Sequence, residues 1–97
     1  MNTTNLSRMN DIRANESQAK ERAQKVFTAI KETTANNPGS YFRVGGVSET
    51  LRNGGFPLGS WEVRGEFTTL AKAGYVKLDA ASARWQLTDT GVATDKI

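Results

Sequence analysis

The stretch SWEVRGEFTTLAKAGYVKL, residues 60–78, decides the fold. Ser60 is a favourable N-cap residue, so a helix is expected to start there. The apolar residues of this helix share one face: Val63, Phe67 and Leu70. Gly74 suits the left-handed position that follows a helix, and residues 75–79 have the composition of a strand. The stretch therefore predicts a helix that runs directly into a strand.

A second strand is predicted over residues 84–88, and the loop AASA joins it to residues 75–79. Two short strands with a four-residue connection are typical of a β-hairpin. After the hairpin, Thr88 can cap a short turn that Gly91 ends.

Upstream of residue 60, the apolar spacing predicts a long helix over residues 16–36, which Pro38 and its neighbours end. Residues 40–44 are predicted as a strand and residues 47–53 as a short helix. Two side chains of the link between the short helix and Ser60 are expected to plug into the core: Phe56 and Leu58.

The run Val63, Phe67, Leu70, Gly74, Tyr75, Val76 resembles the signature of the winged helix-turn-helix family, in which an Ala-Gly-(aromatic or aliphatic)-Val step leads into the wing. The segment RWQLTDTG resembles the family's second wing strand and its closing Leu-Thr-x-x-Gly. The resemblance covers about residues 17–91. It implies an α+β fold of three helices with a small antiparallel sheet and a β-hairpin wing. The link NGGFPLG is longer than the family's usual tight turn.

A chain of 97 residues is long enough for one domain with a modest core. We expect residues 1–15 to be a flexible N-terminal arm, residues 16–91 the domain and residues 92–97 a C-terminal tail. The arm is polar, with apolar residues at every third position: Leu6, Met9 and Ile12. One or two marginal helical turns could form there, and the arm could order on a partner chain or in a DNA groove.

The residues that the chain lacks exclude several kinds of site. Without cysteine and histidine, the usual zinc sites and His-dependent triads are excluded, and the glycine pairs are not followed by a P-loop lysine. We therefore expect no enzyme, no metal and no cofactor. No apolar run has membrane-spanning length, and residues 1–17 lack the apolar core of a signal peptide, so a cytoplasmic location is expected.

Thirteen Lys and Arg against ten Asp and Glu give a net charge of +3, which is compatible with nucleic acid without requiring it. The family resemblance implies that the helix from Ser60 enters the major groove, while the hairpin contacts the DNA backbone. Arg64 is the best candidate for a base contact, because its guanidinium can bind guanine through two hydrogen bonds. The full set of expected DNA-binding residues is Ser60, Trp61, Arg64, Thr68, Lys72, Lys77, Arg84, Arg43 and Arg52.

Three features of the helix allow more than one interpretation. Trp61 could contact a thymine methyl group or a sugar, but burial against Phe56 and Leu58 is favoured. Gly65 permits a close approach either of DNA or of the preceding helix. Glu62 and Glu66 would repel phosphate, although either could accept a hydrogen bond from cytosine, stabilise the helix start, or pair with Arg64 or Arg52.

These observations favour a small protein that binds double-stranded DNA as a homodimer and regulates transcription, with residues 1–30 supplying the dimer interface. A DNA-binding role in plasmid or phage partition or replication is an alternative. A second class is a winged-helix protein-interaction module, such as a phage-encoded inhibitor, which the two glutamates would suit. Convergence of the cations on one face would favour DNA, and dominance of that face by the glutamates would favour a protein partner.

Overall fold

The computed structural model describes residues 3–97, with side chains from residue 18 onward. This part of the chain contains four helices and one three-stranded antiparallel sheet, which confirms the predicted α+β class. In chain order the elements are α1 (Thr3–Thr33), β1 (Tyr41–Phe42), α2 (Val44–Asn53), α3 (Ser60–Lys72), β2 (Val76–Asp79), β3 (Arg84–Leu87) and α4 (Asp89–Ala93).

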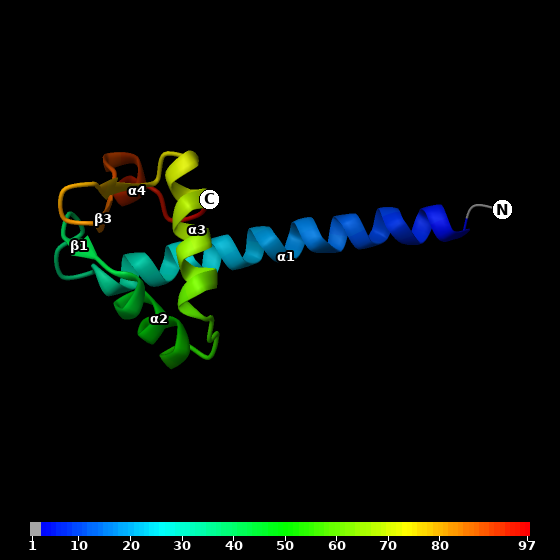
Figure 1. Cartoon of the computed structure of the whole chain (residues 1–97), viewed down its shortest axis with the longest axis horizontal. Helices are drawn as coiled ribbons and strands as arrows, with labels where there is room; N and C mark the ends of the chain where they lie inside the picture. Colours follow the sequence, from blue (N-terminus) through cyan, green and yellow to red (C-terminus); the bar gives the residue numbers. More distant parts are fainter. Residues whose placement is uncertain (1–2) are drawn as a thin grey trace.

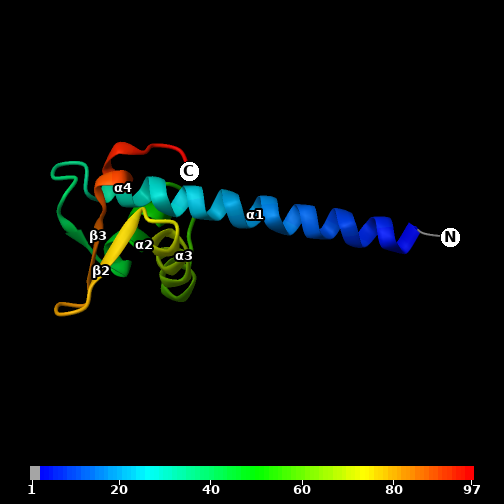
Figure 2. The ribbon, with the colours of Figure 1, turned by 90° about the horizontal axis from the view of Figure 1, so that it is seen from above.

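Helix α1 is much longer than the rest of the domain is wide. Its C-terminal half packs against α2 and α3, whereas its N-terminal half projects away from the other elements (Figures 1 and 2). The predicted helix start near residue 16 is therefore wrong, because α1 begins at Thr3, within the expected arm. The physical reason is that extending an existing helix costs far less free energy than nucleating a new one. Because packing holds the C-terminal half of α1 helical, the polar residues before it can continue the same helix.

The sheet has the strand order β1-β3-β2. The predicted hairpin is confirmed: β2 and β3 pair antiparallel from Val76↔Leu87 to Asp79↔Arg84, which leaves a four-residue loop. The strand predicted over residues 40–44 is shorter than expected, because α2 already begins at Val44. Val44 is partly buried against the core and continues the helical spacing of Val47, which explains the earlier start.

The core lies where α1, α2 and α3 meet the inner face of the sheet. Phe67 of α3 is at its centre, with ring centroids 5.2 Å from Phe42 and 5.3 Å from Trp85. The fully buried side chains come from all three helices: Val26, Phe27, Ile30, Val47, Val63, Phe67 and Leu70. The prediction that Val76 and Leu87 face the core is confirmed, and Phe56 and Leu58 are partly buried against it.

Two glycines are required by the backbone around α3 and α4. Gly74 has a φ of 89°, and the amide of Tyr75 donates to the carbonyl of Leu70, so the predicted left-handed end of α3 is confirmed. Gly91 does not end the turn that Thr88 caps, since α4 continues to Ala93. Its role is a close approach instead: a Cβ there would lie 2.1 Å from the carbonyl oxygen of Tyr75.

The segment after α4 folds back onto α1. The Lys31 ammonium donates to the carbonyl oxygens of Gly91, Val92 and Thr94, at 3.3, 2.7 and 2.8 Å. These include carbonyls at the C-terminal end of a helix, where a positive charge is favourable. The Gln24 side chain also accepts a hydrogen bond from the amide of Ile97 at 2.8 Å. The predicted tail is therefore held against α1.

Candidate functional site

Helix α3 has a buried side and an exposed side. Successive residues of a helix are about 100° apart, so residues that bury one side leave the opposite side to solvent. Those facing the core are Val63, Glu66, Phe67 and Leu70. Those exposed on the other side are Trp61, Arg64, Gly65, Thr68 and Lys72. The exposed side begins at the N-terminal end of the helix, where Gly59 rather than the predicted Ser60 is the N-cap. The amide of Gly59 donates to the Glu62 carboxylate at 3.4 Å, which stabilises this start.

The two glutamates of α3 turn toward α1. Nε of Arg22 donates to Oε2 of Glu66 at 2.7 Å, and its Nη1 lies 3.7 Å from Oε2 of Glu62. The Glu66 side chain is only 8% exposed, so its charge is compensated inside the protein. Arg22 is thus the partner of both carboxylates, so the alternative of a pairing with Arg64 or Arg52 is wrong. The reason is angular: Glu62 and Arg64 are two residues apart, or about 200° around the helix.

The predicted burial of Trp61 is wrong. Its indole is 81% exposed, more than any other large apolar side chain of the described residues. Trp61 precedes Val63 by two residues, so it leaves the helix on the side opposite the core. Phe56 and Leu58, the partners expected for it, line a hollow with Ala19 of α1 instead.

Gly65 is on the same exposed side as Trp61. No atom lies within 4 Å of the position that a Cβ would take there, so the predicted close packing against α2 is wrong. A glycine in the middle of a helix costs about 1 kcal/mol relative to alanine. Among the described residues, no contact within the protein requires a glycine at this position.

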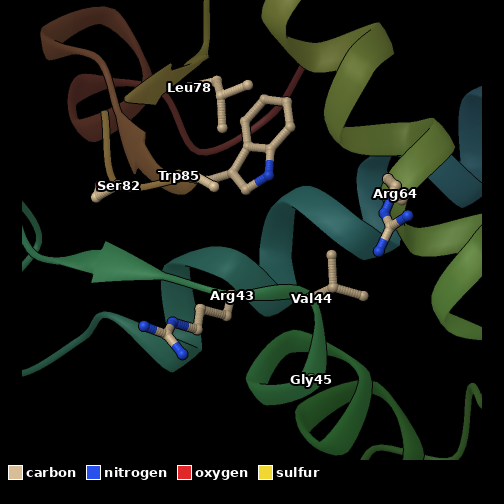
Figure 3. A pocket seen from close by; sticks show the side chains of 8 residues that line it. Arg43, Val44, Gly45, Arg64, Leu78, Ser82 and Trp85 are labelled. Carbon is tan, nitrogen blue, oxygen red and sulfur yellow. The ribbon is translucent and has the colours of Figure 1, made fainter. Parts of the chain in front are cut away.

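Beside Arg64, an open hollow of about 570 Å³ lies between α3, the start of α2 and the hairpin. Arg64 enters it from α3, Trp85 from β3, and Ser82 from the hairpin loop, while Arg43 precedes α2 (Figure 3). The two guanidinium groups point in different directions and flank the hollow. Among the described side chains, neither Arg43 nor Arg64 has an acidic partner. The hollow therefore combines an apolar floor with two uncompensated positive charges.

The two cations of the hairpin, Lys77 and Arg84, do not face this hollow. Lys77 pairs with Gln86, and Gln86 pairs with Tyr41, so these side chains lie on the outer face of the sheet. Arg84 lies on the same outer face, with its guanidinium 4.3 Å from the centre of the Tyr41 ring. The expected cations thus divide between two faces.

The remaining predicted residues are exposed and do not line the hollow between Arg43 and Arg64: Ser60, Thr68, Lys72 and Arg52. Thr68 and Trp61 both line a second open hollow along α3, and the Thr68 hydroxyl donates to the carbonyl of Arg64 at 3.3 Å. Glu49 of α2 is also exposed.

Comparisons with family models, curated proteins and solved structures find no match to this chain. Among the described side chains, no three acidic residues gather closely enough to hold a metal ion. No helix over residues 3–97 combines the length and the apolar character needed to cross a membrane.

Proposed function

We propose that this chain is a winged helix-turn-helix protein that binds double-stranded DNA, with α3 in the major groove. The helix pair α2 and α3, followed by the β2–β3 hairpin, is compatible with that architecture. The solvent-facing side of α3 is free of other elements, and a helix of this kind fits the width of the major groove.

The observation that carries the proposal is the separation of charge around α3. Glu62 and Glu66 point toward Arg22, and Arg64 points the other way, into the hollow beside the hairpin. Phosphate repulsion by the two carboxylates is therefore reduced on the side that would meet DNA. The glutamates were the main sequence argument against DNA, and the ion pair of Glu66 with Arg22 weakens that argument, while Glu62 keeps a half-exposed carboxylate.

In this proposal each exposed residue has a distinct role. Arg64 reads a guanine, because it lies on the exposed side near the helix start. Arg43 holds a phosphate at the other end of the hollow, and Ser60 and Thr68 donate to phosphate oxygens. Lys72 and Arg52 contribute to the general attraction for DNA. Lys77 and Arg84 lie on the outer sheet face, so they contribute less than a position on the hairpin alone would imply.

The test is fluorescence anisotropy on duplexes selected from a random pool, with wild type, Arg64→Ala and the matched control Lys77→Ala. Loss of Arg64 should cost about 1–3 kcal/mol on the selected site and relax preference at one base pair. Loss of Lys77 should weaken binding by less than about two-fold, since its charge acts from the far side of the sheet. Equal losses for the two variants would contradict the assignment of the binding face.

A protein-interaction module is the second candidate, and the exposure of Trp61 favours it. Tryptophan is among the commonest residues at the centres of protein interfaces. Arg64 and Arg43, which have no acidic partner among the side chains from residue 18 onward, favour DNA over this alternative. If wild type binds no duplex at low salt, the protein-partner function replaces the DNA function.

We further propose that the protein acts as a homodimer that regulates transcription, with α1 at the dimer interface. An isolated helical segment of 12–15 residues is marginal in water, so the projecting half of α1 would gain from a partner. Multi-angle light scattering of wild type should give the dimer mass, and deletion of residues 1–15 should give the monomer mass. A monomeric wild type, or an unchanged mass after deletion, would rule out this interface.

A further inference from the structure

Trp61 is a large apolar side chain that the fold leaves in solvent. Its indole is 81% exposed, against 41% for Tyr41 and 50% for Leu78. Burial of an aromatic ring is among the largest stabilising contributions that one side chain can make, and this protein forgoes it. No side chain among the described residues covers the Trp61 ring, so its exposed face is free to meet a partner.

The surroundings of the indole restrict what that partner can be. Arg64 follows it by three residues and Gly65 by four, so both lie beside it on the helix surface. Gly65 presents bare backbone with open space above it, which lets a flat partner come close. Trp61, Arg64, Gly65 and Thr68 line one open hollow of about 580 Å³.

We propose that Trp61 is a specificity-determining residue that recognises thymine through its C5 methyl group. This inference rests on the proposed DNA function. In the major groove only thymine presents a methyl group, and apolar side chains recognise it by contact. Arg64 lies one helical turn away, and its guanidinium can bind guanine. The DNA site should therefore contain a thymine within one or two base pairs of that guanine.

The charged lining of this hollow, with Arg64 beside the indole and unpaired among the described side chains, favours DNA over an apolar protein surface as the occupant. Arg64 borders the same hollow, and Arg43 flanks the adjoining one. The acidic residues that share the hollow with Trp61 are Glu62 and Glu66, and both approach Arg22. Arg22 compensates the charge of Glu66 and reduces that of Glu62, so a polyanion would approach the indole from the side of Arg64 and Arg43.

The test removes the methyl group alone. Once a binding site has been selected from a random duplex pool, each thymine is replaced in turn by deoxyuridine, and the dissociation constant is measured for wild type and Trp61→Ala. For wild type, one replacement should weaken binding about four-fold, the effect of one buried methyl group. For Trp61→Ala, the two duplexes should bind equally. Tyr41→Ala, which removes an exposed aromatic side chain of the outer sheet face, should discriminate as wild type does.

The outcomes separate this inference from the proposed function. If wild type binds the duplex but tolerates every deoxyuridine within 1.5-fold, or if Trp61→Ala keeps the discrimination, the thymine role is wrong and the DNA function stands. If wild type prefers single strands, and Trp61→Ala abolishes that preference, the indole stacks on bases and the thymine role is also wrong. If no nucleic acid binds, the DNA function itself fails.

Discussion

Replacing Arg22 by alanine should destabilise the fold more than any other change of an arginine on the described surface. Arg22 is the ion-pair partner of Glu66, whose side chain is 8% exposed, at an Nε–Oε2 distance of 2.7 Å. Removing one partner of a buried ion pair costs about 3–5 kcal/mol. Because the Arg22 side chain is 41% exposed, water can enter the vacated space, and we expect a smaller cost than for a fully buried pair, about 2–3 kcal/mol. That loss corresponds to a decrease in Tm of roughly 10–20 °C.

Urea unfolding measures this loss, and the fluorescence of Trp85 can report it because its ring packs on Phe67 in the core. The matched control is Glu62→Gln, which removes an exposed carboxylate 3.7 Å from the same guanidinium and should cost less than about 1 kcal/mol. The double variant Arg22→Met/Glu66→Met should recover most of the stability, since an apolar pair leaves no buried charge. If Arg22→Ala costs no more than Glu62→Gln, the ion pair does not anchor α3 to α1.

Three further predictions concern other parts of the fold. Lys31→Met should cost about 1–3 kcal/mol in urea unfolding and speed amide exchange after α4, whereas Asp95→Asn, at a 97% exposed carboxylate, should cost almost nothing. Gly91→Ala should lower Tm sharply, because the new Cβ would clash with the carbonyl oxygen of Tyr75. Gly65→Ala, where the Cβ meets open space, should instead add about 0.5–1 kcal/mol of stability and still weaken DNA binding. An NMR titration should give Asp79 a pKa below its ordinary value of 3.8, because the Ser82 hydroxyl and the amide of residue 81 donate to its carboxylate. The ionised carboxylate should therefore stabilise the fold above pH 3.8, and this contribution should be lost as the pH falls through the lower folded pKa.

Local chemistry was sufficient to predict most elements of the domain. The hairpin register followed from alternation together with the four-residue loop, since a slip of one residue would move Val76 or Leu87 away from the core. Gly74 identified the end of α3, because glycine adopts the left-handed conformation at little cost. The start of α1 could not be predicted in this way, because polar residues without a stripe of their own continue a helix that is nucleated elsewhere.

The candidate site was harder to predict, because it depends on contacts between distant segments. Trp61 was expected to be buried because tryptophan is mostly buried in folded proteins. Its spacing of two residues from Val63 already placed it on the opposite side of the helix. Arg22 was missed because its partner is 44 residues away in the sequence. One signal was available: Arg22 is four residues before Val26, on the apolar side of α1, where an unpaired cation would be costly.

The salt dependence of duplex binding by the wild-type protein tests the central claim most directly. Anisotropy titrations of a random-sequence duplex should give an association constant whose logarithm falls linearly with the logarithm of salt concentration, by about 0.9 for each neutralised phosphate. Arg43→Ala should make that slope shallower by about one unit. An association constant that does not change between about 50 and 200 mM salt, or the absence of binding to any duplex, would contradict DNA recognition by this face of α3.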